Sequence, residues 1–349
     1  MIIFVNQKAD MKKNTILILM TVMLLPSLSC VPNNTSRPDT IPLVRRIAAD
    51  STGQRAVVAS YPAGAEGVVA VVGETAGVRS VVNRMLVTDE YDNINAALNP
   101  DGLPDFAGET IYGVADLRNE SYDALLRRGE ETVREAVVRS VVTALDTLES
   151  PAAKLIVLAS PLSSAFGVFD VDTLFKMTGA QPRFIEPVGA ILSAAGNGQN
   201  VLIATTASLT EAYTSAAEAS NSSVHAFASE ETLATDYLRE VLVQYRDAGF
   251  KSLVTVIATD NYNQGAEAIR NAIEFLRSGI FPEDKSLSEL VAHDCKVVDI
   301  TSAIVRACYL KMRNDNIFTH NISYPSARCF GFEMDEAIEE MQLEEYVSD

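Results

Sequence analysis

Polar side chains that can hold a ligand or move a proton follow five short apolar segments of the chain. They come directly after runs of valine, leucine and isoleucine, and they are Glu74, Thr75, Ser160, Ser163, Thr206, Ser229, Asp260 and Asn261. Hydroxyl, amide and carboxylate groups bind small polar ligands through directed hydrogen bonds. We therefore predict that these eight residues bind a ligand, and we assign no catalytic residue among them.

The same residue types also have a purely structural explanation. Ser, Thr, Asp and Asn are the favoured N-caps of helices, and Ser208 with Glu211 has the spacing of such a cap. The two explanations are compatible, because a helix N-terminus presents free N–H groups to an anion. The grouping of these residues at one edge of a sheet is what favours binding, and it depends on the elements that carry them.

Short apolar runs alternate with segments of helical periodicity along the chain. We predict strands at residues 67–72, 110–114, 154–159, 184–188, 200–205, 224–228, 253–258 and 296–300, and helices at residues 121–148, 207–219, 230–248, 264–277 and 301–312. The strands are continuously apolar, as in a parallel sheet covered on both faces. The pattern predicts an α/β fold that is doubly wound, with mainly parallel sheets in two Rossmann-like lobes. Ligands bind such sheets at the carboxyl ends of the strands.

The first 29 residues are typical of an export signal. Lys12 and Lys13 precede an almost wholly apolar stretch at residues 15–25, which is too short for a membrane-spanning helix. Ser29 and Cys30 follow, which resembles a bacterial lipoprotein signal, so we predict that Cys30 is lipidated; an ordinary signal peptide with an incidental cysteine is the alternative. The expected location is the bacterial cell envelope, lipid-anchored at the periplasmic or outer-membrane face, with residues 30–40 as a tether.

The remaining chain divides by pattern into three parts. We expect an N-terminal α/β lobe at residues 41–160, a C-terminal α/β lobe at residues 161–300, and C-terminal helices at residues 301–349 that return to the body, including an acidic amphipathic helix at residues 333–349. Residues 89–109 form an acidic loop. Its carboxylates do not match the spacing of a calcium loop, so we predict a solvated surface for Asp89, Glu90, Asp92, Asp105 and Glu109.

Composition and missing motifs exclude several functions. The chain has 28 Lys and Arg against 46 Asp and Glu, a net charge of −18, which argues against nucleic acid as a partner. It lacks G-x-G-x-x-G, G-x-x-x-x-G-K-[ST], G-x-S-x-G and H-E-x-x-H. We therefore predict no cofactor and no metal. Beyond Cys30, the cysteines are Cys295, Cys308 and Cys329, which allow one disulfide and one free thiol.

Residues 231–280 resemble the second half of a type I periplasmic-binding protein. In that family a strand ends in an acidic or amide residue, and the next helix opens with a small residue and Gly-Ala. Here Thr259, Asp260 and Asn261 end the strand, and Gly265 and Ala266 enter the helix. The resemblance implies that Asp260 contacts a ligand and that two lobes close on a small polar solute.

Three functions remain open from the sequence. The first, which the resemblance favours, is a lipid-anchored extracytoplasmic small-solute-binding protein with the solute, the membrane and a transporter or receptor as partners; it needs no chemistry. The second is an α/β hydrolase or isomerase that uses Ser160, Ser163, Asp260 or Cys295, with Glu74 as general acid or base. The third is a non-catalytic interaction lipoprotein.

Overall fold

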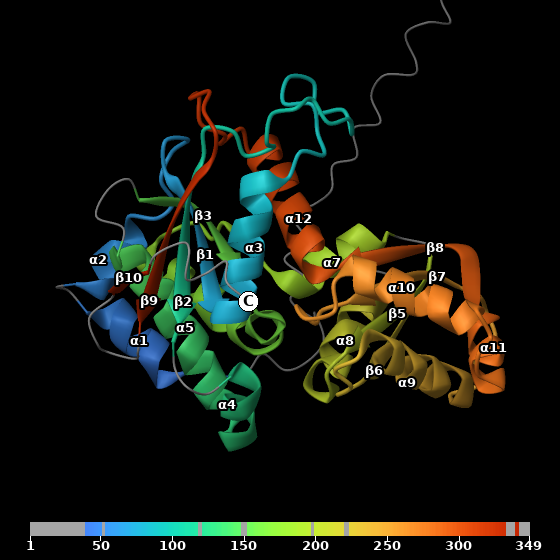
Figure 1. Cartoon of the computed structure of the whole chain (residues 1–349). Helices are drawn as coiled ribbons and strands as arrows, with labels where there is room; N and C mark the ends of the chain where they lie inside the picture. Colours follow the sequence, from blue (N-terminus) through green and yellow to red (C-terminus); the bar gives the residue numbers. More distant parts are fainter. Residues whose placement is uncertain are drawn as a thin grey trace, which may run out of the picture.

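The chain folds into two lobes, each built on a sheet with helices packed around it (Figure 1). The computed structural model describes residues 39–50, 53–117, 121–147, 152–196, 199–219, 223–332 and 339–341. Strands and helices alternate in both lobes, and the strands are parallel except for one antiparallel edge. The prediction of a doubly wound α/β fold with mainly parallel sheets in two lobes is confirmed.

Lobe 1 contains a six-stranded sheet in the order β10-β9-β2-β1-β3-β4. Its strands are β1 (Val68–Glu74), β2 (Thr110–Asp116), β3 (Ala153–Leu158), β4 (Phe184–Ile185), β9 (Ser326–Phe332) and β10 (Glu339–Met341). Its helices are α1 (Pro42–Ala49), α2 (Gln54–Ala59), α3 (Thr75–Val87), α4 (Tyr122–Arg128), α5 (Glu130–Thr147), the π-helical turn η1 (Ser163–Gly167) and α6 (Val168–Thr178). The central strands β1, β2 and β3 end side by side, which brings their carboxyl ends to one edge.

Lobe 2 contains a four-stranded parallel sheet in the order β6-β5-β7-β8. Its strands are β5 (Asn200–Thr205), β6 (Ser223–Ala228), β7 (Val254–Thr259) and β8 (Val291–Asp299). Its helices are the 3-10 turn η2 (Ala207–Leu209), α8 (Thr210–Ala219), α9 (Ala234–Asp247), α10 (Ala266–Arg277) and α11 (Pro282–Ser288). The carboxyl end of β8 leads directly into the region between the lobes (Figure 1).

Two helices lie between the sheets and join the lobes. These are α7 (Pro187–Ala195), which precedes β5, and α12 (Ile300–Asn314), which follows β8 and packs on α7 and α3. Asp299 caps α12 by accepting a hydrogen bond from the Ser302 backbone N–H at 2.9 Å. One stripe of α12 is buried because apolar residues recur every fourth position, at Ile300, Ile304, Cys308 and Met312.

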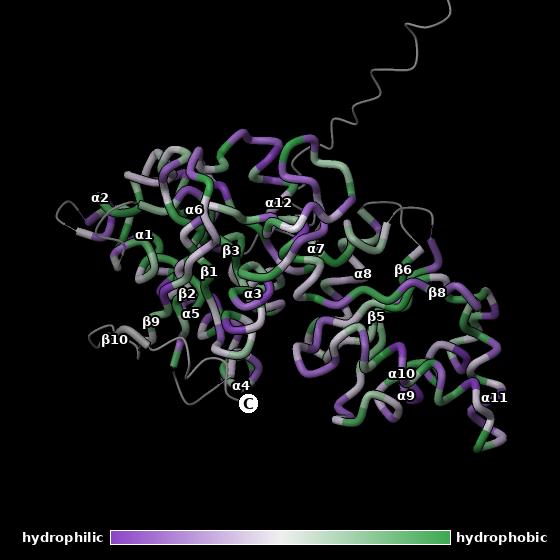
Figure 2. The backbone as a smooth tube through the Cα atoms, turned by 45° about the horizontal axis from the view of Figure 1, so that its top comes forward, coloured by the Kyte–Doolittle hydropathy of each residue, from purple (hydrophilic) through white to green (hydrophobic). Residues whose placement is uncertain are grey.

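Continuous burial explains why the central strands could be predicted. Residues Val68 to Val72 of β1 are at most 1% exposed, so both faces of the strand are covered. Figure 2 shows the same feature as hydrophobic backbone running through the interior of lobe 1. Full burial of one such side chain contributes roughly 1.5–3 kcal/mol.

The structure differs from the sequence-based expectations at the C-terminal part of the chain. Residues 326–332 form β9, which pairs with β2, and residues 339–341 form β10, where helices were expected. The sheets also divide the chain differently from the expected bounds 41–160 and 161–300, because β4 at Phe184–Ile185 pairs with β3 in lobe 1. β9 was not predicted, and its pairing with β2 joins segments more than 200 residues apart, which leaves no local pattern to detect.

The acidic loop at residues 89–109 satisfies its own backbone. The Asp105 carboxylate accepts the Tyr91 backbone N–H at 2.9 Å, and the Asp89 carboxylate accepts the Gly102 backbone N–H at 2.9 Å. Asp105 is 2% exposed, and Glu109 is 1% exposed and pairs with the buried Lys154 at 2.6 Å. The prediction of a solvated surface is therefore wrong for Asp105 and Glu109.

The predicted signal, tether and lipidation site, including Cys30, lie outside the described residues. Within the described part of the chain, every helix is too short or too polar to cross a membrane.

Candidate active site

A hydroxyl–carboxylate pair lies at the carboxyl edge of the lobe 1 sheet. Ser160, which follows β3, donates its Oγ hydrogen to Glu74 Oε2 at 2.6 Å. The second oxygen of Glu74 accepts the Tyr122 backbone N–H at 2.9 Å. Both carboxylate oxygens are therefore fixed, and Ser160 is only 1% exposed. The pair exists because β1 and β3 are parallel neighbours whose ends coincide.

Gly77 in the first turn of α3 allows this close approach of helix and strand. A Cβ atom at Gly77 would lie 2.1 Å from the Ala159 carbonyl oxygen and 3.1 Å from Tyr262 Cε2. Any larger residue would push α3 away from the end of β3. The position of Glu74, the N-cap residue of α3, therefore depends on this glycine.

Lobe 2 carries a second hydroxyl–carboxylate pair at its own carboxyl edge. Thr205, the last residue of β5, donates its Oγ1 hydrogen to Asp260 Oδ2 at 2.5 Å. Asp260 directly follows β7, and its side chain is buried, 5% exposed. Burial raises the pKa of Asp260 to about 6, and the hydrogen bond from Thr205 acts in the opposite direction. Near neutral pH this carboxyl group can therefore both accept and donate a proton.

A buried tyrosine lies beside the lobe 2 pair. The Tyr213 hydroxyl of α8 is fully buried and has no hydrogen bond of normal geometry to any described residue. Burial, and then the negative charges of Asp260 and Glu186, raise its pKa well above the usual value. Tyr213 therefore keeps its proton and directs a neutral O–H group toward the carboxylates.

Tyr262 connects the two edges. Its hydroxyl, from the loop after β7 in lobe 2, donates to the Ala159 carbonyl oxygen in lobe 1 at 2.5 Å. Burial, followed by the charges of Glu74, Asp260 and Asp299, raises the pKa of Tyr262 well above the usual value. The bond joins the loop after β7 to the end of β3, so these strand ends of the two lobes face each other. Ser208 and Asp123 add a second bridge between the lobes at 3.1 Å.

The structure gives the eight predicted residues different roles at the strand ends. Glu74, Ser160 and Asp260 belong to the two pairs. Thr75 begins α3, Ser163 begins η1 and is 1% exposed, and Thr206 is the N-cap of η2, all at the same edges. The Asn261 side chain accepts the Asn263 backbone N–H at 2.9 Å and so shapes the turn before α10.

Ser229 lies beside Thr205, whose carbonyl oxygen accepts its backbone N–H at 2.9 Å, but its side chain points elsewhere. It follows the edge strand β6, and its hydroxyl donates to Glu240 Oε2 of α9 at 2.6 Å, within lobe 2. The residues that sequence reasoning missed are Thr205, Tyr122, Tyr213 and Tyr262. Thr205 was counted as part of a strand, while Tyr262 carried a detectable signal, since it directly follows Asp260 and Asn261 at a strand end.

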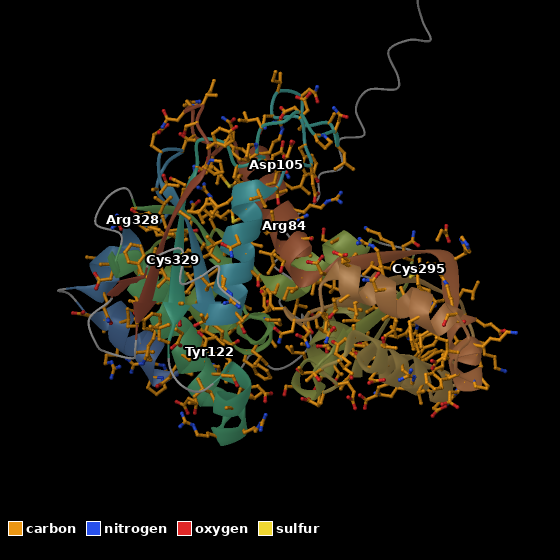
Figure 3. The ribbon with its side chains drawn as sticks, in the orientation of Figure 1. Arg84, Asp105, Tyr122, Cys295, Arg328 and Cys329 are labelled. Atoms are coloured by element: carbon orange, nitrogen blue, oxygen red, sulfur yellow. The ribbon has the colours of Figure 1, made fainter. Side chains whose placement is uncertain are left out.

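The cysteines do not provide the chemistry. All three in the described chain are free thiols, and Figure 3 shows Cys329 in lobe 1 and Cys295 in lobe 2, far from each other. Burial raises the pKa of Cys295 to about 11 and that of Cys329 to about 11, and it raises the pKa of Cys308 further. These thiols stay protonated and are poor nucleophiles. Among the described residues, no cluster of three His, Cys, Asp or Glu side chains is arranged to hold a metal ion.

Comparison with known proteins gives a likeness of fold. No family model matches the sequence, and a search of curated proteins finds no match. A glutamate racemase from Bacillus anthracis aligns over 76% of this chain and 88% of its own, at 16% identity and a TM-score of 0.51. A glutamate racemase from Francisella tularensis, in complex with D-glutamate, aligns over 81% of this chain and 100% of its own, at 14% identity and a TM-score of 0.51. A glutamate racemase from Thermus thermophilus, in complex with beta-chloro-D-alanine, aligns over 82% of this chain and 95% of its own, at 13% identity and a TM-score of 0.50.

The chain shares the fold of glutamate racemases. This finding corrects the functional expectation, because these three structures are racemases and none of them is a solute-binding protein. The resemblance of residues 231–280 to a type I periplasmic-binding protein is upheld only as a two-lobed α/β architecture; the assignment itself is not confirmed. The likeness agrees better with the second function considered from the sequence, an enzyme that works at the strand carboxyl ends.

Proposed function

We propose that the chain is an isomerase that moves a proton at one carbon atom of a small polar substrate held between the lobes. One observation carries the proposal: each lobe ends in a hydroxyl–carboxylate pair, Ser160 with Glu74 at 2.6 Å and Thr205 with Asp260 at 2.5 Å. Inversion at a carbon atom requires a proton acceptor on one face and a donor on the other. Opposed pairs on two lobes provide both.

The substrate class we propose is an amino acid. The structures that share the fold are glutamate racemases, and one of them was solved with D-glutamate. A substrate carboxylate is suited to the N-terminal end of α3, which begins at Thr75, and to the turn that begins at Thr206. Free backbone N–H groups at these positions bind anions, and they also stabilise negative charge that develops during proton removal.

Asp260 and Glu74 have the central roles in the mechanism. Asp260, with a pKa of about 6, exchanges a proton readily near neutral pH. Glu74 acts from lobe 1, where Ser160 and the Tyr122 backbone N–H hold it in one orientation. In one direction Asp260 accepts the proton from carbon and the Ser160–Glu74 pair returns one to the opposite face. In the other direction the roles reverse.

A serine hydrolase is less well supported. In the Ser-His-Asp hydrolases a histidine is the general base of the serine, whereas Ser160 donates to a carboxylate. His225, on β6, interacts with Asn200 at 3.1 Å and packs against the Phe250 ring. A carboxylate partner suits proton relay better than the formation of an acyl intermediate.

Solvent exchange at the substrate α-carbon tests the proposal. The purified protein is incubated in D₂O with single enantiomers of glutamate, aspartate, alanine and serine, and α-deuterium and D/L ratio are followed by NMR and chiral chromatography. We expect exchange and racemisation of at least one amino acid, with a loss of about 100-fold or more in S160A and D260N. S229A is the matched control, because the Ser229 hydroxyl makes the same 2.6 Å bond to a glutamate, Glu240 of α9, and takes no part in either pair. Exchange that survives unchanged in S160A and D260N would refute these roles.

We also propose that the protein is held at the cell envelope through Cys30. The support for this is the basic, apolar and small-residue pattern of residues 1–30. Metabolic labelling with an alkyne fatty acid should label the native chain and not C30S, and C30S should leave the membrane fraction. Equal labelling of both chains would refute the anchor.

A further inference from the structure

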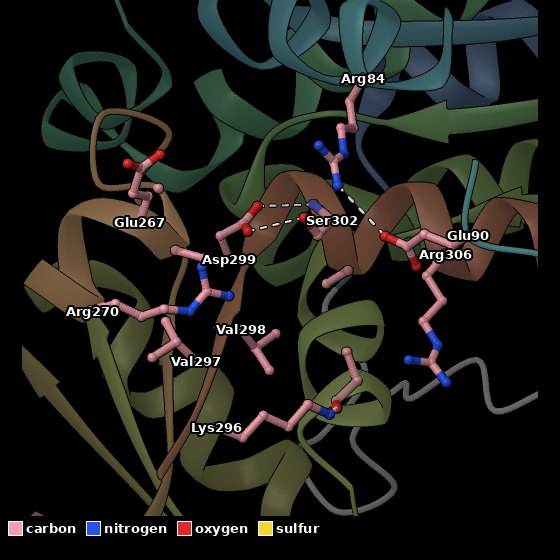
Figure 4. Close-up of a pocket in the computed structure, with 14 residues that line it drawn as sticks. Arg84, Glu90, Glu267, Arg270, Lys296, Val297, Val298, Asp299, Ser302 and Arg306 are labelled. Carbon is pink, nitrogen blue, oxygen red and sulfur yellow. Dashed lines mark hydrogen bonds and ion pairs between the residues drawn. The ribbon is translucent and has the colours of Figure 1, made fainter. Parts of the chain in front are cut away.

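A cavity opens between the lobes, lined by residues outside the two hydroxyl–carboxylate pairs. It holds about 490 Å³, within the size range of small-molecule pockets. Its walls come from both lobes: Arg84 of α3 on one side, Arg270 of α10 and Lys296 of β8 on the other, and Arg306 of α12 along the junction (Figure 4). None of these residues belongs to the hydroxyl–carboxylate pairs.

The cavity concentrates positive charge in an acidic protein. The chain has 28 basic residues against 46 acidic ones, yet four basic side chains line this one space. Chance placement on such a surface would give more acidic than basic residues. Three acidic residues, Glu90, Glu267 and Asp299, also line the cavity, so the lining has a balance of one positive charge in a chain of net charge −18.

Partners inside the protein neutralise only part of this charge. Arg84 pairs with Glu90 at 3.5 Å, and Asp299, the acidic residue on the opposite wall, is occupied by the Ser302 backbone N–H and hydroxyl at 2.9 Å each. Arg270 and Arg306 form no ion pair or hydrogen bond with any described residue. The acidic side chain left on the wall is Glu267, which is exposed in the first turn of α10.

Lys296 is held toward the same space. Its ammonium donates to the Ala194 carbonyl oxygen at 2.6 Å, which fixes its direction and leaves its charge unpaired among the described residues (Figure 4). Burial, and then the nearby Arg306, lower the pKa of Lys296. The two cations thus repel each other across the cavity, and a bound anion would relieve that repulsion.

We infer that this cavity binds a small polyanion that carries at least two phosphoryl or carboxylate groups, with Arg270, Arg306 and Lys296 as its main ligands. Guanidinium groups bind such groups through paired, charge-assisted hydrogen bonds. The volume exceeds that of a single inorganic phosphate, so the occupant has two anionic ends or an attached organic group. This is a binding site in addition to the proposed active site, and its existence does not depend on the isomerase activity.

The site is placed to influence lobe closure. Asp299 lies on the cavity wall and also acts on Tyr262, the residue that bridges to Ala159 in lobe 1. Arg270 and Lys296 belong to lobe 2, and Arg306 belongs to α12, which packs on α3 of lobe 1, so a ligand that contacts all three binds most tightly when the lobes hold this arrangement. Binding therefore shifts the population toward the closed form.

Calorimetry with two probes tests the inference. Inorganic pyrophosphate and citrate are titrated into the full-length protein and into R270A, R306A and K296Q at constant ionic strength, with sodium chloride as the screening control. We expect saturable binding of at least one probe and about tenfold weaker binding for each variant. R246A is the matched control, because Arg246 lies on α9 and pairs with its neighbour Asp247. The preference between pyrophosphate and citrate identifies the anionic group.

Two results would overturn the inference. One is a heat of titration that follows ionic strength alone for both probes. The other is unchanged affinity of both R270A and R306A for the probes. Neither arginine has an ion-pair partner among the described residues, so both variants should stay folded, and thermal unfolding verifies this. Hydrogen exchange in residues 259–266 tests closure separately: protection should increase with bound probe, and binding without added protection would remove the proposed effect on the lobes.

Discussion

Replacement of Asp260 by asparagine should make the protein more stable and less active. Burial raises the pKa of Asp260 from an ordinary 3.8 to about 6. The folded state therefore holds this proton more tightly than the unfolded state, and the carboxyl group supports folding fully below pH 3.8. That support is lost as the pH rises through 6.

The magnitude follows from the two pKa values. The difference between 3.8 and about 6 corresponds to about 3 kcal/mol of unfolding free energy, of which about 2 kcal/mol is lost between pH 4 and pH 7. The asparagine side chain carries no charge, and its carbonyl oxygen can still accept the Thr205 hydroxyl. We expect equal stabilities of the two chains at pH 4 and a more stable D260N, by up to about 2 kcal/mol, at pH 7.5.

Urea unfolding of the full-length protein at several pH values measures this difference. Comparison of the two chains at each pH cancels the titration of all other groups. D247N serves as the control, because the Asp247 side chain is 62% exposed on α9. The reasoning is refuted if D260N loses stability relative to wild type as the pH rises, or if the difference between the chains is constant.

Three further predictions concern the packing around the site. G77A should destabilise the protein by about 1–3 kcal/mol in urea unfolding, because its Cβ would lie 2.1 Å from the Ala159 carbonyl oxygen. G64A is the control and should leave the stability unchanged, because open space surrounds its Cβ. Similar losses of stability in both variants would contradict this packing. Y262F should remove the 2.5 Å bond between the lobes and increase hydrogen exchange at residues 259–262 while changing stability by only about 1 kcal/mol; unaltered exchange would show that this bond does not hold the lobes. In a chain that begins after Cys30, a thiol reagent at pH 7 should label at most Cys295, which is partly exposed. Cys308 and Cys329 are buried and should be labelled only after urea unfolds the protein. Rapid labelling of all three thiols in the native protein would contradict this burial.

The strand ends could be predicted because their cause is local. β1, β3, β5 and β7 are short, continuous apolar runs, and a change to polar residues marks where each strand ends. Parallel pairing then brings these ends together whatever the order of the strands. Glu74, Ser160 and Asp260 were found for this reason, without knowledge of the topology.

Other parts of the site depend on pairing partners that the sequence does not specify. Ser229 follows a strand in the same way as Ser160, but β6 is an edge strand, and its end meets Glu240 of α9 instead of the other lobe. Thr205 was overlooked because its hydroxyl points to a residue 55 positions later. β9 was not predicted because Arg328 interrupts its apolar pattern, and its pairing with β2 spans over 200 residues of sequence.

The bond between Tyr262 and Ala159 sets a condition on any substrate. A ligand that reaches both pairs must pass between Glu74 and Asp260, where the ring of Tyr262 lies against the start of α3. Substrate entry therefore requires this bond to break and the lobes to separate. The substrate first binds to an open form, and the lobes close on it afterwards. A polyanion in the neighbouring cavity favours the closed form through Arg270, Arg306 and Lys296. The two ligands then compete for the same lobe equilibrium, and a polyanion slows turnover by delaying opening without touching the reacting atoms.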